Sequence, residues 1–191
     1  MRKFWTGVCV LMILSCCACS HVRDTDLNKA INDFYARTAE FSAVCAVRMD
    51  HGDTVSDYVI DYRLTDGLHT LTVREPMVLN GLTVTMHGTE QTITYDGMVF
   101  APDALVGTAV SPVRILCDLL PTLQQGYAEM AGRNGEAIAC TFSSARTGEE
   151  LVYRVCFSAE TMLPESAECF FDGYMVMTVG FSDVVATEFE E

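Results

Sequence analysis

The segment YVIDYRLTDGLHTLTV, residues 58–73, consists of two alternating stretches joined by a turn. Tyr58, Ile60 and Tyr62 alternate with smaller or polar neighbours, which is typical of a strand with one buried face. Asp66-Gly67 is a dipeptide that favours the tight turns of β-hairpins. The segment therefore predicts an antiparallel hairpin with one apolar face.

Similar alternating segments precede and follow this hairpin, and the dipeptides Asp96-Gly97 and Asp172-Gly173 repeat its turn chemistry. Together they predict about ten or eleven strands in one antiparallel sheet that is covered on one side and wetter, with more threonine, on the other. A sheet of that size tends to curl, so we expect it to be half open with a concave face. The second strand of the hairpin includes residues 71–73. The further strands are expected at residues 41–49, 82–86, 93–95, 137–142, 151–157, 167–171 and 174–181.

Two segments have the spacing of amphipathic helices. The first begins near Asp24 and runs for about four turns, with apolar or small side chains at helical spacing. The second begins at Ser111-Pro112, a capping residue followed by proline at the first helical position, and ends before Gly126. The expected fold class is therefore α+β and mainly β, with helices that cover or plug the concave face. The expected buried stripes are Leu27, Ile31, Phe34 and Thr38 in the first helix, and Val113, Leu116, Leu119, Leu120 and Leu123 in the second.

The composition indicates one globular domain. The chain has 191 residues, of which half are hydrophobic and a fifth are charged, so it can bury a core and is not intrinsically disordered. Its formal charge of −14 would repel the phosphates of nucleic acid, which excludes that class of partner. We expect a single domain over residues 20–191.

Residues 1–19 have the pattern of an export signal. Two basic residues precede the apolar run Phe4–Leu14, and small residues and cysteines follow it. The run is shorter than a bilayer span of about 20 residues. The cysteines resemble a bacterial lipobox, in which Cys16 fits best as the lipidated residue, Cys19 is the alternative and Cys17 fits worst. Cleavage by an ordinary signal peptidase, without lipidation, is the other interpretation.

Lipidation at this position would decide where the protein resides. A diacylglyceryl group and an N-acyl chain such as palmitate each add roughly 0.8 kcal/mol of membrane affinity per buried methylene. The predicted location is therefore the extracytoplasmic face of the cell membrane, reached through a lipid anchor.

Five cysteines remain after the signal, an odd number without C-x-x-C spacing, which favours neither a zinc site nor a disulfide framework. Cys140 and Cys156 flank a predicted hairpin, but the alternation places them on opposite faces of the sheet, which argues against a bridge. The five are Cys45, Cys117, Cys140, Cys156 and Cys169.

No catalytic or metal-binding pattern stands out. The sequence contains neither G-x-S-x-G nor H-E-x-x-H, and none of its four histidines lies within four residues of another. We interpret His51, His69 and His87 as turn residues exposed to water, with His51 at one end of the sheet and the other two at the opposite end. We expect no enzyme activity, no cofactor and no metal.

The order of the elements resembles the LolA/LolB/RseB type, the outer-membrane-lipoprotein-carrier family, and is most similar to GerS-like lipoproteins of Gram-positive anaerobes. The resemblance implies a half-open antiparallel barrel closed by helices, with a hydrophobic cavity that holds the acyl chains of lipoproteins. No functional residue can be carried over, because no short motif matches. The pieces that carry the likeness are the lipobox, Phe41-Ser42-Ala43, Val73-Arg74-Glu75-Pro76, Gly81-Leu82, residues 93–97, the Ser111-Pro112 helix and Leu163-Pro164.

Two functions follow from these expectations. The first is a membrane-anchored, non-enzymatic lipoprotein that binds an acyl chain, a lipid or a lipoprotein in the cavity. The alternative is an envelope adaptor that recruits or regulates a cell-wall (peptidoglycan) enzyme through a sheet edge or the helix-covered face. The residues expected to line the cavity are Tyr58, Ile60, Tyr62, Leu71, Val73, Leu82, Val84, Met86, Val155 and Phe157.

Overall fold

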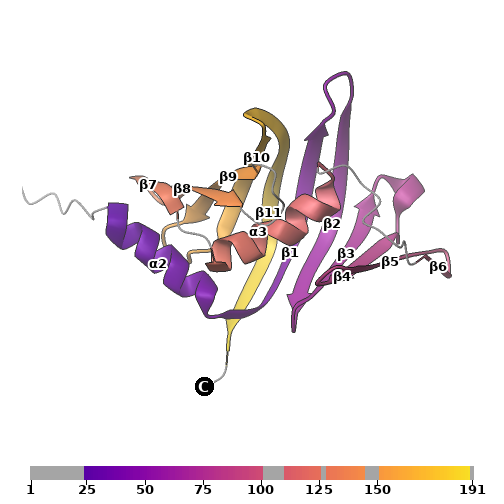
Figure 1. The fold of residues 1–191 in the computed structure, drawn as a ribbon, viewed down its shortest axis with the longest axis horizontal. Coiled ribbons are helices and arrows are strands. Elements are labelled where there is room, and N and C mark those ends of the chain that lie inside the picture. The colour runs from indigo at the N-terminus through magenta and orange to yellow at the C-terminus, as the bar shows by residue number, and fades with distance from the viewer. Residues whose placement is uncertain (1–23, 101–109, 126–127, 145–150, 190–191) are drawn as a thin grey trace, which may run out of the picture.

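The structure, a computed structural model, describes residues 24–100, 110–125, 128–144 and 151–189 (Figure 1). Two α-helices, a short 3-10 helix and eleven strands make up the described chain. In order they are α2 (Asp24–Ala36), β1 (Thr38–Asp50), β2 (Val55–Thr65), β3 (Leu68–Glu75), η2 (Met77–Leu79), β4 (Thr83–His87), β5 (Glu90–Tyr95), β6 (Met98–Phe100), α3 (Pro112–Gln125), β7 (Ala128–Asn134), β8 (Ala137–Ser144), β9 (Leu151–Ser158), β10 (Pro164–Phe171) and β11 (Tyr174–Glu188).

The strands form one open antiparallel sheet in the order β6-β5-β4-β3-β2-β1-β11-β10-β9-β8-β7. The first and last strands of the described chain pair in the middle of the sheet, where Cys45 of β1 lies opposite Phe181 of β11. Among the described strands, β6 and β7 are the two edges of the sheet. The predicted fold class, a large half-open antiparallel sheet with two helices, is confirmed.

The turns explain why consecutive strands pair. In the Asp66-Gly67 turn both residues have positive φ, 52° and 75°, as a type I′ hairpin requires. Asp96-Gly97 and Asp172-Gly173 have the same conformation. Aspartate and glycine tolerate this left-handed region better than branched residues do. The three reversals predicted from these dipeptides are confirmed.

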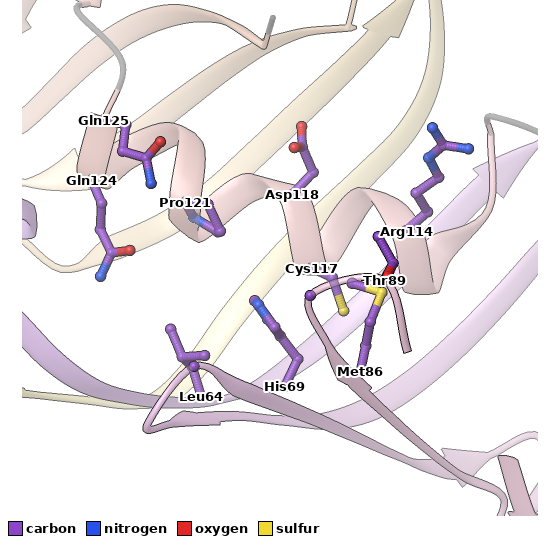
Figure 2. Close-up of a pocket in the computed structure, with 12 residues that line it drawn as sticks. Leu64, His69, Met86, Thr89, Arg114, Cys117, Asp118, Pro121, Gln124 and Gln125 are labelled. Atoms are coloured by element: carbon purple, nitrogen blue, oxygen red, sulfur yellow. The ribbon is translucent and has the colours of Figure 1, made fainter. Parts of the chain in front are cut away.

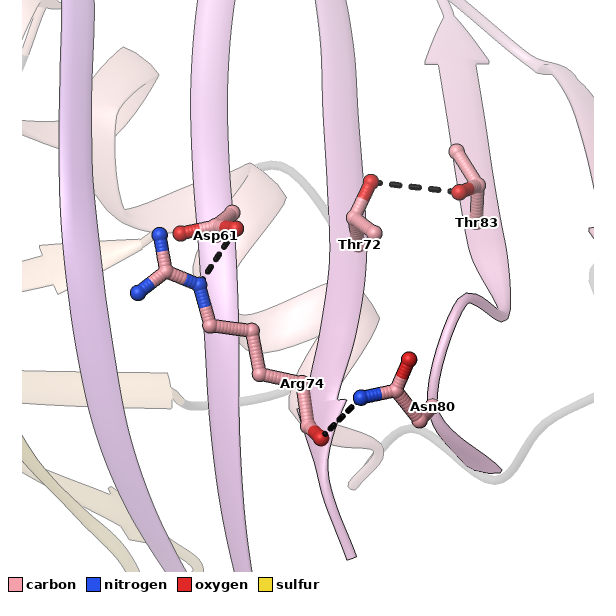
Figure 3. Close-up of polar contacts among 5 residues, drawn as sticks. All are labelled: Asp61, Thr72, Arg74, Asn80 and Thr83. Carbon is pink, nitrogen blue, oxygen red and sulfur yellow. Dashed lines mark hydrogen bonds and ion pairs between the residues drawn. The ribbon is translucent and has the colours of Figure 1, made fainter. Parts of the chain in front are cut away.

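Polar side chains cover the face of the sheet that the core does not use (Figure 3). Arg74 Nε donates to Asp61 Oδ2 over 2.6 Å, and the hydroxyls of Thr72 and Thr83 lie 3.1 Å apart across β3 and β4. Asn80 Nδ2 donates to the carbonyl oxygen of Arg74. An exposed ion pair of this kind contributes at most about 1 kcal/mol. This face is therefore solvated, as the threonine-rich alternation predicts.

Both helices lie on the other face of the sheet (Figure 1). α3 differs from the amphipathic helix that the sequence predicts, because every residue from Ile115 to Leu123 is buried. It packs against β1, β8 and α2, so several sides of the helix meet protein instead of one. Its first turn is capped as predicted, since the N–H of Arg114 donates to Ser111 Oγ. The concave face is thus plugged by α3 and covered further by α2.

Two observed strands, β6 and β7, lie outside the ranges expected from the sequence, and β7 carries no strand signal of its own. β7 has the sequence AEMAGRN, which lacks an apolar alternation and contains a glycine. It pairs with β8 through residues such as Ala131, which lies opposite Cys140. α2 packs beside it, and Asn28 Nδ2 donates to the carbonyl oxygen of Ala128. Pairing and cover from its neighbours, more than its own propensity, therefore hold this strand in place.

Because residues Ile115 to Leu123 of α3 are buried, shortening a core residue of this helix should be costly. Leu116→Ala is expected to lower the free energy of unfolding by about 2–5 kcal/mol, as truncation of a fully buried leucine does. Val113→Ala, at a half-buried position one turn earlier, should cost clearly less. Chemical denaturation followed by circular dichroism measures both; equal and small losses would show that α3 does not occupy the core in solution.

Candidate functional site

A groove of about 530 Å³ separates α3 from the ends of the β2–β3 and β4–β5 hairpins (Figure 2). The helix contributes residues spaced three or four apart, which therefore share one face. The opposite wall comes from the two hairpins. The lining residues are Arg114, Cys117, Asp118, Pro121, Gln124 and Gln125 of the helix, and Leu64, Gly67, His69, Met86, Gly88 and Thr89 of the hairpins.

The groove has the size of a small-molecule site. Arg114 and Gln125 stand at its two ends, eleven residues apart, which corresponds to roughly 16 Å along an α-helix. Its volume lies within the range of about 300–1,000 Å³ that is usual for ligand pockets. Four side chains, Leu64, Met86, Cys117 and Pro121, provide apolar surface between the ends.

His69 is buried in the wall of the groove, so its interpretation as an exposed turn residue is wrong. The turn consists of Asp66 and Gly67 alone, so His69 already belongs to the strand. Leu68, the first residue of that strand, takes the outward position. The alternation then turns His69 inward with Leu71 and Val73. As predicted, His87 lies at the same end of the sheet, next to this position on β4 and exposed.

His69 Nδ1 lies 2.9 Å from the hydroxyl oxygen of Tyr62. Burial raises the pKa of Tyr62 well above its ordinary value, so the phenol stays protonated. The Tyr62 hydroxyl therefore donates and Nδ1 accepts. This contact fixes the imidazole against the sheet.

Asp118 is a carboxylate in the middle of an apolar helix, and it is only 7% exposed. Its Oδ2 accepts a hydrogen bond of 2.8 Å from Tyr153 Oη and a longer one from Thr122 Oγ1. Burial, followed by the nearby charge of Asp118, raises the pKa of Tyr153, so Tyr153 remains a donor. The pair ties α3 to β9 and satisfies a buried charge.

The cysteines near the groove are poor nucleophiles. Burial, with the charge of Asp118 as the second cause, raises the pKa of Cys117 to about 12, and Cys169 has the same value for the same reasons. Burial raises the pKa of Cys45 to about 12 as well. Because the thiolate is the reactive form, these thiols are inert near neutral pH.

The five described cysteines are free. Cys140 is buried and lies opposite Val155, whereas Cys156 is half-buried and lies opposite Ala139. The two therefore occupy opposite faces, as the alternation predicts. Among the residues that the structure describes, no group of three or more His, Cys, Asp or Glu side chains is placed to hold a metal ion.

Of the residues predicted to line a cavity, Met86 lies on the groove, where it is half-buried. Tyr58 and Leu82 are half-buried elsewhere on the sheet. The others are buried among the core side chains: Ile60, Tyr62, Leu71, Val73, Val84, Val155 and Phe157. The two candidate lipidation sites, Cys16 and Cys19, lie outside the described residues.

Sequence reasoning did not find the polar side of the groove. Arg114, Asp118 and Gln124 belong to a helix that was recognised only by its leucines. One signal was available, because an aspartate four residues after an arginine, inside an apolar helix, needs a buried partner. The partner, Tyr153, could not be identified without the fold.

Removing the hydroxyl of Tyr153 tests the buried contact. Tyr153→Phe is expected to lower the free energy of unfolding by about 1.5–3 kcal/mol, because Asp118 loses a donor that it cannot replace with water. Tyr174→Phe is the matched control at a side chain that is 77% exposed, and it should change stability by less than about 0.5 kcal/mol. Equal stabilities of the two variants would contradict the buried Tyr153–Asp118 contact.

No family model matches this chain, and no curated protein matches it either. The fold is nevertheless similar to solved structures. An uncharacterized conserved protein from Thermus thermophilus has a TM-score of 0.50 and 9% identity, over 88% of this chain and 90% of its own.

Two further solved structures carry names that appear in the sequence resemblance. A LolA superfamily protein from Nitrosomonas europaea has a TM-score of 0.45 and 10% identity, over 85% of this chain and 94% of its own. A chain in the complex of the CwlD amidase with the GerS lipoprotein from Clostridioides difficile has a TM-score of 0.39 and 15% identity, over 87% and 93%. At these identities the likeness concerns the fold alone.

Proposed function

We propose that this protein is a non-enzymatic lipoprotein that binds one acyl chain of a lipid or lipoprotein in the groove between α3 and the β2–β3 and β4–β5 hairpins. The observation that carries the proposal is the apolar middle of the groove, formed by Leu64, Met86, Cys117 and Pro121. A chain of about 16 carbons gains on the order of 12 kcal/mol by leaving water, so an apolar slot can hold it without specific polar contacts. The length of the groove, roughly 16 Å, suits such a chain laid along the helix.

The filled part of the concave face limits the cargo. Residues such as Ile60, Leu71 and Phe157 are buried in the core that includes α3. An occupant can therefore use the groove without opening the core, but it cannot use the whole concavity. This supports one chain as the cargo, and the predicted lining residues beyond Met86 then serve as the packed wall behind it.

The chemistry near the groove supports binding over catalysis. The thiol of Cys117 is held protonated by burial and by the charge of Asp118, with a pKa of about 12. The carboxylate of Asp118 is engaged by Tyr153, and the Nδ1 of His69 by Tyr62. General acid–base or nucleophilic catalysis needs a group that can exchange a proton or attack near neutral pH. The Asp118 carboxylate and the Nδ1 of His69 are engaged in structural contacts, and the Cys117 thiol stays protonated.

The membrane anchor is the second part of the proposal. Neither α-helix of the described chain has the length and apolar character needed to cross a bilayer. The proposed anchor is a lipid on Cys16, with Cys19 as the alternative, at the start of a domain that spans residues 20–191. It places the groove at the extracytoplasmic face of the membrane.

A pair of matched substitutions tests the acyl-chain site. Met86→Asp places a charge on the groove, whereas Met98→Asp places the same charge on β6, where the methionine is 54% exposed. Each full-length variant is purified from membranes in mild nonionic detergent and examined by native mass spectrometry. We expect lipid to remain bound to the native chain and to Met98→Asp, and to be lost from Met86→Asp, because an unpaired charge is costly in an apolar site. Lipid retained by all three proteins, or by none, would refute the proposed site.

The alternative function is the adaptor, and one observation favours it. The edge strand β6 exposes Met98, Val99 and Phe100, and the nearby η2 exposes Met77 and Val78. Tyr95 Oη donates to the carbonyl oxygen of Val78, which ties η2 to β5. An exposed apolar edge can accept a strand of another protein.

Crosslinking from the sheet edge tests the adaptor. A photoreactive residue at Phe100 should capture a peptidoglycan enzyme in intact cells, and one at Tyr174, which is also exposed, should not. Val99→Lys should abolish the capture, because a lysine on an edge strand disfavours pairing with another strand. Capture that is equal from both positions would exclude this edge as the docking surface.

A further inference from the structure

We propose that the groove selects amphiphiles with an anionic head group, and that Arg114 binds that head group while the acyl chain lies along α3. This inference rests on the proposed function and specifies the class of ligand. It is carried by the position of Arg114, by the absence of an ion pair between Arg114 and any other described residue, and by the distribution of polar groups along the groove.

Arg114 lies in the first turn of α3 and is one of the residues that line the groove. In Figure 2 its side chain extends from the same side of the helix as that of Asp118. Its backbone N–H donates to Ser111 Oγ over 3.2 Å, so the start of the side chain is fixed by the helix cap. The side chain is half-buried. Among the described residues it is the one Lys or Arg that lines this groove.

The guanidinium of Arg114 forms no ion pair within the described part of the chain. Carboxylates are abundant in this protein, with 26 acidic and 12 basic residues. Arg63 and Arg133 also form no ion pair among the described residues, but both are exposed, whereas Arg114 is half-buried. A partly desolvated cation is costly unless an anion or several acceptors face it. Five other cations do have carboxylate partners: Lys29 with Asp33, Arg37 with Glu188, Arg48 with Asp57, Arg74 with Asp61, and Arg154 with Glu168.

The order of groups along the groove sets the direction of the ligand. Arg114 marks one end, Cys117 and Pro121 form the apolar middle of the helix face, and the neutral amides of Gln124 and Gln125 mark the other end. An amphiphile bound with its anionic oxygens at Arg114 can lay its chain across the middle toward the glutamines. Guanidinium matches the paired oxygens of a carboxylate or a phosphate, and either could provide the head group.

Asp118 limits how far the anion can move along the helix. Its carboxylate lies one turn beyond Arg114 and is held by Tyr153. A negative head group is attracted at Arg114 and repelled one turn later, so the charge pattern fixes the position of the head group at the end of the groove.

The test compares ligands that share a hexadecyl chain and differ in charge. Palmitate, hexadecanol and hexadecyltrimethylammonium are added to the full-length protein in nonionic detergent, and the bound fractions are measured by native mass spectrometry. We expect palmitate to bind best and hexadecyltrimethylammonium worst. Arg114→Gln should weaken the binding of palmitate about tenfold, which is the effect of losing one charge-assisted hydrogen-bonded pair. It should change the affinity for hexadecanol by less than about twofold.

Arg63→Gln is the matched control, because Arg63 is exposed on the outer face of β2 and also forms no ion pair among the described residues. It should leave the binding of all three probes unchanged. Added salt should weaken palmitate binding to the native chain and not to Arg114→Gln, since salt screens only the charged contact. Loss of folding would reduce the bound fraction of all three probes together, whereas loss of the head-group contact would reduce the bound fraction of palmitate alone.

The outcomes separate the two proposals. Equal binding of the three probes, with no effect of Arg114→Gln, overturns the head-group inference and leaves the acyl-chain site standing. Failure of every probe to bind overturns both. A fourth probe, lysophosphatidic acid with one palmitoyl chain, distinguishes the source of the anion: preference for it indicates a phospholipid, and preference for palmitate indicates a fatty acid.

Discussion

The burial of α3 against the open face of the sheet is the constraint on which the rest of the molecule depends. An eleven-stranded sheet exposes a large apolar face, and the part of the chain that the structure describes forms no second sheet to cover it. The helix fills that role with a run of buried residues from Ile115 to Leu123. The hydrophobic energy of this contact offsets the cost of burying Asp118, which Tyr153 then satisfies.

One helix is narrower than the face it covers, and this mismatch creates the groove. α3 contacts β1, β8 and α2, on the side of the sheet that also includes β7. Toward the hairpins that carry Leu64 and Met86, the sheet continues beyond the reach of the helix. The groove is therefore a consequence of topology. The strands of the C-terminal half pack against α3, and the strands of the N-terminal half extend past this helix.

The sequence predicts the sheet well because its signals are local. Alternation and the Asp-Gly dipeptides act over a few residues, so β2, β3 and the turn at Asp66-Gly67 could be recognised without the fold. β7 was missed because its stability comes from β8 and α2, which no local pattern encodes. The expectation that His69 is exposed was wrong by one residue along the strand, because a shift of one residue exchanges the inner and outer faces of a sheet. The groove could not be predicted, since it depends on where α3 stops covering the sheet.

The polar face of α3 explains why the groove stays open instead of closing onto the hairpins. Gln124 Nε2 already donates to the carbonyl oxygen of Thr38. Moving the helix toward Leu64 and Met86 would desolvate other polar groups of this face, such as the amide of Gln125, and a buried polar group without a partner is costly. The apolar residues of the same face, Cys117 and Pro121, remain beside the open space. A helix with leucines at these polar positions would pack onto the hairpins and close the groove. In the proposed binding mode, polar groups of this helix face thus serve both to bind the head group and to keep the space for the acyl chain.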